Sequence, residues 1–238
     1  MRYVVHGAGA IGGVVGARLF RAGVPVVLIA RGAHLAAIRR GGLGLSSPEG
    51  SESCAVPAVG APSEIGFRGD DVVLLATKTQ DAAAALDALR DAAVPAVPVV
   101  CLQNGLESAR LALRRFERVL GAMLMLPTSH LEPGVVLAHS APVPGVVDLG
   151  RFPPARTSSP RRSPPICVAR AWPPRCAPRS SPGSGLNGEI ALLGRLHDVP
   201  TPLNAALQSL AGRLARERRS PASLGVGELR ASLSRAPS

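Results

Sequence analysis

The feature that most constrains this chain is a glycine-rich turn at residues 7–12, Gly-Ala-Gly-Ala-Ile-Gly. Residues 3–7, Tyr-Val-Val-His-Gly, read as a short buried strand that leads into it. From Ile11 to Ala22 the apolar residues recur at helical spacing, and Gly23 ends the pattern. A glycine turn between a strand and a helix is typical of a nucleotide-binding α/β fold.

Each glycine of this turn has an expected role. Gly7 allows the tight turn, Gly9 lets the backbone approach a pyrophosphate, and Gly12 lets helix and strand pack closely. The start of a helix adds free N–H groups and a partial positive charge. We therefore predict a dinucleotide site, with a turn that binds no ligand as the alternative; its residues are Gly7, Ala8, Gly9, Ala10, Ile11 and Gly12.

The remaining pattern to residue 152 alternates between strands and helices. Residues 24–30, VPVVLIA, form a continuous apolar run, as expected of a strand that is covered on both faces. Such alternation predicts a Rossmann-type, doubly wound parallel sheet. The expected helices are 33–40, 80–91 and 107–115, and the expected strands are 71–76, 97–102, 119–126, 134–139 and 145–150.

Arg31 follows the second strand, where an NAD-binding chain usually has an acidic residue that accepts hydrogen bonds from the ribose 2′-hydroxyl. A cation at this position suits a 2′-phosphate instead. We therefore predict NADP(H) as the cofactor rather than NAD(H). The alternative is that Arg31 is an ordinary solvated charge.

Two further polar residues follow strands of the predicted sheet. Lys78, the only lysine of the chain, follows the strand at 71–76, and Asn104 follows the strand at 97–102. Ligands of open α/β sheets bind at these carboxyl ends. We predict that both residues line a ligand site, although an ordinary surface charge at Lys78 and a simple Asn-Gly turn at Asn104 remain alternatives.

Charge and composition change abruptly at residue 151. Residues 151–185 contain nine prolines, seven arginines and no acidic residue, so most of the net charge of +11 belongs to this segment. Such proline density excludes regular structure there. A basic segment raises nucleic acid as a partner, but the segment has few aromatic residues for base stacking, so we expect none.

The chain regains helical character from Leu186 onward. Residues 186–198 have helical periodicity, and Thr201-Pro202 is a good start for another helix. We therefore divide the chain into a cofactor domain at 1–152, an irregular segment at 153–185 and a helical region at 186–238.

Several classes of protein are disfavoured by what the sequence lacks. No apolar run approaches the roughly 18 residues that a membrane span requires. The four cysteines match neither a zinc pattern nor a disulfide scaffold, and the five histidines are scattered, so we expect no metal site and a reduced, cytoplasmic protein.

Taken together, GAGAIGG, Arg31, TKTQD at 77–81, LQNGLE at 102–107 and LNGEIALLGRLHDVPTPLNAAL at 186–207 resemble ketopantoate reductase. The resemblance covers about residues 1–152 and 186–230. It implies NADPH-dependent reduction of 2-dehydropantoate, a 2-keto acid, to pantoate in pantothenate biosynthesis. It also implies a second, all-helical domain, of which residues 186–238 are a truncated remnant, and an active cleft at the junction of the two domains. By the same resemblance, residues 7–12 hold the pyrophosphate, Arg31 holds the 2′-phosphate, and Lys78 and Asn104 line the cofactor and substrate side of the cleft. A homodimer is left open.

The departures from this family are as informative as the match. The family has a general-acid lysine in the second domain, but no lysine follows Lys78 here. The family's substrate-binding glutamate is also missing before Asn187-Gly188. No catalytic residue is therefore identified, and we predict cofactor binding without appreciable turnover.

The anomalous segment at 153–185 leaves two hypotheses open. Its composition is what a GC-rich gene yields in the wrong reading frame, which favours a frame-disrupted chain. The alternative is a natural basic linker. By function, the alternatives to an impaired reductase are a non-catalytic NADP(H)-binding protein and, less favoured, a basic nucleic-acid-binding protein.

Overall fold

The computed structural model describes residues 1–141, 143–153, 200–217 and 227. The chain divides into two units, Met1–Pro178 and Arg179–Ser238, and each is described by itself. The expected helix at 186–198 and nearly all of the segment at 153–185 lie outside the described residues, so the proposed domain limits remain a prediction.

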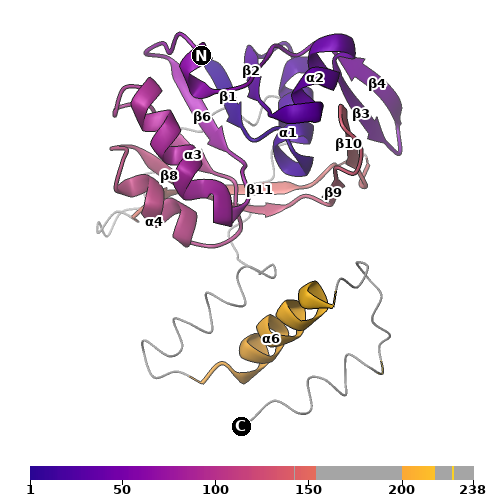
Figure 1. Cartoon of the computed structure of the whole chain (residues 1–238), viewed down its shortest axis with the longest axis vertical. Helices are drawn as coiled ribbons and strands as arrows, with labels where there is room; N and C mark the ends of the chain where they lie inside the picture. The colour runs from indigo at the N-terminus through magenta and orange to yellow at the C-terminus, as the bar shows by residue number, and fades with distance from the viewer. Residues whose placement is uncertain (142, 154–199, 218–226, 228–238) are drawn as a thin grey trace. The chain divides into compact units, whose positions relative to one another are not determined.

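The first unit contains a seven-stranded sheet in the order β11-β8-β7-β6-β1-β2-β5 (Figure 1). All neighbours pair in parallel except β11, which runs antiparallel to β8. The order reverses beside β1, as in a doubly wound fold. The strands are β1 (Arg2–His6), β2 (Val26–Ile29), β5 (Ala58–Val59), β6 (Asp71–Leu75), β7 (Val99–Cys101), β8 (Val119–Met125) and β11 (Val146–Phe152).

The apolar strands of this sheet are buried on both faces because helices cover them. On β1, Tyr3 and Val5 belong to one hydrophobic cluster and Val4 belongs to the other. The first cluster packs against α1 (Ala10–Arg21), and the second packs against α3 (Thr79–Ala92) and α4 (Glu107–Leu113). This arrangement explains why the strands read as continuous apolar runs rather than as alternating ones.

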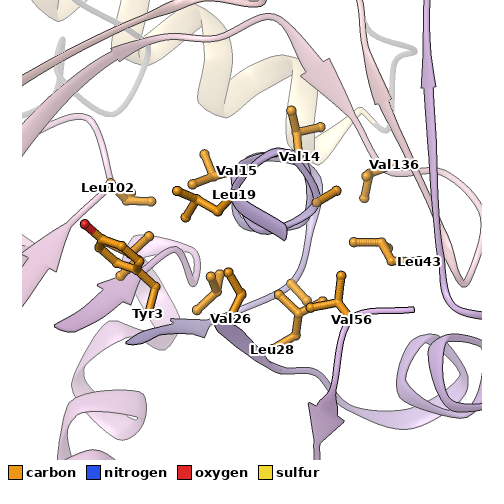
Figure 2. Packing of buried hydrophobic residues seen from close by; sticks show 14 of the residues in the cluster. Tyr3, Val14, Val15, Leu19, Val26, Leu28, Leu43, Val56, Leu102 and Val136 are labelled. Atoms are coloured by element: carbon orange, nitrogen blue, oxygen red, sulfur yellow. The ribbon is translucent and has the colours of Figure 1, made fainter. Parts of the chain in front are cut away.

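A second sheet has four strands in the order β4-β3-β10-β9. Its strands are β3 (Leu43–Ser47), β4 (Gly50–Cys54), β9 (Thr128–Ser129) and β10 (Val135–Ala138). Helix α1 packs between the two sheets, as Figure 2 shows for Val14, Leu28 and Val136. Two of its glycines permit this: an added Cβ would lie 2.6 Å from Val136 Cγ1 at Gly13 and 2.6 Å from Leu28 Cδ2 at Gly16.

The expected elements of residues 1–152 are present, and the Rossmann-type fold is confirmed. Helix α2 (Gly32–Gly41) follows β2, and the short 3-10 helix η1 (Pro62–Glu64) follows β5. The sequence analysis missed β3, β4, β5 and β9, and it did not foresee that β10 belongs to a separate sheet.

In the second unit, helix α6 (Pro202–Arg216) begins at the residue that the Thr-Pro pattern indicated. The Thr201 carbonyl accepts a hydrogen bond from the Ala205 N–H at 3.1 Å, as expected of the residue that precedes a first helical turn. Leu210 is buried in this unit.

Candidate functional site

The glycine turn lies between the end of β1 and the start of α1. The N–H groups of Gly7 and Ala8 both donate to the Ile29 carbonyl of β2, each at 3.1 Å. Gly7 has a φ of 106°, and an added Cβ there would lie 2.8 Å from the Thr77 backbone nitrogen. A residue with a side chain is therefore excluded at Gly7 by both its conformation and its neighbours.

Gly9 and Gly12 differ in what surrounds them. An added Cβ at Gly12 would collide with the Gly7 carbonyl oxygen and lie 2.8 Å from Ala76 Cβ, so Gly12 serves helix–strand packing. At Gly9 an added Cβ meets no atom within 4 Å, and its φ of −71° needs no glycine. Since nothing in the described structure requires glycine at position 9, an external ligand that approaches the backbone is a physical reason for it.

The N–H groups at this turn are available to such a ligand. Gly9 is the N-cap of α1, and its N–H has no hydrogen-bond partner within the described residues. The first turn of α1 has no acidic residue, so the partial positive charge of the helix end is not neutralised there. A pyrophosphate fits these donors.

Arg31 is exposed at the N-cap of α2, directly after β2. Within the described residues no carboxylate lies within ion-pair distance of its guanidinium. Behind it, the buried side chain of His6 lies at the end of β1. Burial, with a smaller contribution from Arg31, lowers the pKa of His6 to about 4, so the imidazole is neutral at pH 7. Arg31 thus supplies the positive charge on this side of the glycine turn.

Lys78 lies at the N-cap of α3, exposed, in the loop that follows β6. The buried side chain of Gln103 fixes this loop, because its Nε2 donates to the Thr77 carbonyl at 2.8 Å. Two buried polar atoms, Thr77 Oγ1 and Gln103 Oε1, have no hydrogen-bond partner within the described residues. Buried polar groups normally have partners, so this edge of the sheet has hydrogen-bonding capacity for a ligand.

Asn104 has a structural partner that the sequence did not reveal. Its Oδ1 accepts from the Leu124 N–H at 3.1 Å, and its Nδ2 lies 3.4 Å from the Leu124 carbonyl oxygen. Strand β8 continues past the end of β7 at Cys101, and the Asn104 amide pairs with the backbone that β7 leaves open. Among the described residues the amide has no partner for its second N–H or its second lone pair, and its role towards substrate or cofactor stays a prediction.

The predicted residues therefore fall along one edge of the sheet, at the carboxyl ends of β1, β2, β6 and β7. Comparison with known proteins shows the family to which the chain belongs. The family model for ketopantoate reductase PanE/ApbA matches residues 3–154. The chain belongs to the ketopantoate reductase family.

Relatives and solved structures agree with this assignment. A 2-dehydropantoate 2-reductase of Pyrococcus horikoshii is 31% identical over 156 residues, which are 66% of this chain and 49% of that protein. One of Mesorhizobium japonicum is 41% identical over 107 residues, 44% of this chain and 32% of that protein. The 2-dehydropantoate 2-reductase structure from Geobacter metallireducens has a TM-score of 0.58 at 32% identity and covers 66% of this chain and 51% of that one.

A D-mandelate dehydrogenase structure with NADH and anilino(oxo)acetate has a TM-score of 0.57 at 25% identity, and covers 63% of this chain and 48% of that one. The chain spans about half or less of the length of the curated relatives it matches. The part that matches the family model, residues 3–154, contains the Rossmann-type fold.

The described residues contain neither a membrane-spanning helix nor a cluster of metal ligands. No helix among them is long and apolar enough to cross a membrane. No group of three or more His, Cys, Asp or Glu side chains in that part of the chain is placed to hold a metal ion.

Sequence reasoning overlooked Thr77, Gln103 and His6 at this edge. Thr77 and Gln103 lie within the two segments already selected for Lys78 and Asn104, so their position after a strand was a usable signal. His6 lies in the segment that was predicted as a buried strand and directly precedes Gly7, so its position was a usable signal as well.

Proposed function

We propose that this chain binds NADP(H) with the pyrophosphate at residues 7–12 and the 2′-phosphate at Arg31. The observation that carries the proposal is the contrast between Gly12, which packing requires, and Gly9, where no described neighbour requires a glycine. The free N–H of Gly9 and the uncompensated start of α1 supply donors for the pyrophosphate.

The choice of NADP(H) over NAD(H) rests on Arg31. Its guanidinium is exposed, lacks a carboxylate partner in the described part of the chain, and follows β2, where the adenosine ribose lies in Rossmann-type folds. A guanidinium pairs with a phosphate through two parallel hydrogen bonds. The D-mandelate dehydrogenase structures with NADH show that similar folds also take the other cofactor, so selectivity needs its own test.

The same proposal extends to chemistry on a 2-keto acid, ketopantoate being the substrate that the family's name indicates. Bound NADPH would supply the hydride for reduction of the keto carbon. Lys78 and Asn104 would line the cofactor and substrate side of the site. No lysine follows Lys78 among these 238 residues. We propose that these residues do not supply the group that protonates the keto oxygen in the family, and that turnover is impaired.

Arg31→Gln tests the cofactor assignment, with Arg40→Gln as a matched control on the same helix. Both arginines are exposed. Loss of a charged hydrogen bond to the 2′-phosphate should weaken NADPH binding about 10- to 100-fold, while NADH binding changes little. Arg40→Gln should leave both affinities unchanged. Equal effects of the two substitutions on NADPH would refute the role of Arg31.

Turnover separates an impaired reductase from an active one. Loss of a general acid typically lowers the rate about 10²- to 10⁴-fold. We therefore expect NADPH absorbance to decay very slowly when ketopantoate is added to the complex. Oxidation at an ordinary enzymatic rate would contradict the proposed impairment, and its complete absence would favour the non-catalytic NADP(H)-binding protein. A cytoplasmic location and a homodimer remain predictions.

A further inference from the structure

His34, in the first turns of α2, connects the glycine turn to the second sheet. Its Nε2 lies 2.8 Å from the Ala8 carbonyl oxygen, and its Nδ1 lies 2.8 Å from the Gly134 backbone nitrogen. A carbonyl oxygen only accepts and a backbone N–H only donates. The imidazole must therefore carry its proton on Nε2 and accept at Nδ1, which fixes both its charge and its tautomer.

The surroundings of His34 favour this neutral form. Burial lowers the pKa of His34, and the neighbouring His130 lowers it further against the opposing effect of the Ala8 carbonyl. The two rings lie 4.2 Å apart between centroids, tilted by 56°. His130 donates from Nδ1 to the Val135 carbonyl at 3.0 Å.

The Gly134 side of this connection is held rigidly. Gly134 has a φ of 84°, and an added Cβ would lie 2.8 Å from Ala37 Cβ of α2. The turn before β10 therefore packs directly on the helix that carries His34. This packing fixes the position of the Gly134 N–H, and the hydrogen bond from that N–H fixes the position of the His34 imidazole.

The hydrogen bond to Ala8 has a consequence for Gly9. The peptide between these residues is planar and trans, so its C=O and its N–H point in opposite directions. The Ala8 N–H is itself fixed by the Ile29 carbonyl. When His34 holds the Ala8 carbonyl towards α2, the Gly9 N–H is turned away from α2, and it has no partner in the part of the chain that the structure describes.

We propose that His34 is a positioning residue that orients the Ala8–Gly9 peptide, so that the Gly9 N–H is presented to the cofactor pyrophosphate. This inference rests on the proposed function. His34 does not touch the cofactor itself. It acts through Ala8, and the link to Gly134 keeps the imidazole in the orientation and tautomer that this task requires.

Two substitutions separate the two hydrogen bonds of His34. The Nε2 of glutamine replaces histidine Nε2, so His34→Gln keeps a donor for Ala8 and loses the acceptor for Gly134. Asparagine Oδ1 replaces Nδ1, so His34→Asn keeps the acceptor and is too short to reach Ala8. Each variant loses one hydrogen bond, which makes them matched for a general effect on stability.

NADPH titration of the full chain then distinguishes positioning from support of the fold. We expect His34→Asn to weaken NADPH binding about tenfold, the equivalent of one hydrogen bond, and His34→Gln to bind about as wild type does. The control is His139→Asn. His139 directly follows β10 and contacts Ser129, and its substitution should leave the NADPH affinity unchanged. Equal affinities of both His34 variants would overturn the inference.

Hydrogen–deuterium exchange of residues 7–13 without cofactor gives a second measurement. Faster exchange in His34→Asn than in His34→Gln is expected, and equal exchange would overturn the inference. If the wild-type chain binds neither NADPH nor NADH, the proposed function falls, and exchange alone decides the role of His34. Should the variants not fold, ¹⁵N NMR of wild-type His34 decides: a proton on Nε2 supports the inference, and a proton on Nδ1 overturns it.

Discussion

Replacing Gly9 by alanine should separate cofactor binding from stability. The φ of −71° suits alanine, and the new Cβ meets no atom within 4 Å. At such a position the change from glycine to alanine stabilises a protein by about 0.4–1 kcal/mol, because the unfolded chain loses freedom. The same methyl group occupies the space through which a phosphate would approach the Gly9 N–H. Loss of that charged hydrogen bond should weaken NADPH binding about 10- to 100-fold.

Gly12→Ala should lower the free energy of unfolding, in contrast to Gly9→Ala. The added Cβ collides with the Gly7 carbonyl oxygen and presses on Ala76, and overpacking of this kind costs about 1–3 kcal/mol. Gly69→Ala is the control, because Gly69 has open space and lies before β6, at the other end of the sheet. Urea denaturation and NADPH titration of the three variants make the comparison. Full NADPH affinity in Gly9→Ala would refute the assignment of the pyrophosphate site.

The remaining predictions concern pH and ion pairs. Between pH 6.5 and 4 the unfolded chain protonates His6 and the folded chain does not, so the free energy of unfolding falls by about 3 kcal/mol as the pH is lowered. In His6→Gln, urea denaturation across this range should show a free energy of unfolding that depends less on pH. An unchanged pH dependence would contradict the burial of a neutral imidazole. Asp71→Asn breaks a buried pair in which Arg2 Nε donates at 2.9 Å, and it should lower the free energy of unfolding by about 3 kcal/mol. Asp87→Asn breaks the pair with Arg115, in which the Asp87 side chain is 43% exposed, and should lower the free energy of unfolding much less than Asp71→Asn does; equal losses at both sites would contradict this contrast.

Sequence periodicity predicted the large sheet well because its strands are continuous apolar runs. It failed at β3 and β4, where residues 43–54 are rich in glycine and serine and lack the β-branched residues that mark strands. These strands form because Leu43 and Leu45 pack beneath α1 and β3 pairs with β10, far along the chain. Neither contact is visible in a local pattern.

The candidate site was predictable to the extent that it depends on position after a strand. That rule selected Arg31, Lys78 and Asn104, but it could not show that the Asn104 amide pairs with Leu124. The partner arises because β8 extends past β7, which is a property of strand lengths in the folded sheet. The two-sided hydrogen bonding of His34 likewise depends on tertiary structure, since Gly134 belongs to the second sheet's turn.

The most direct test of the account is a fluorescence titration of the purified full chain with NADPH and, separately, with NADH. We expect saturable binding of NADPH and clearly weaker binding of NADH, because the proposed pyrophosphate site at the glycine turn suits both nucleotides and the proposed partner of the 2′-phosphate is Arg31. Absence of binding by both nucleotides would contradict the central claim that residues 7–12 form a working cofactor site.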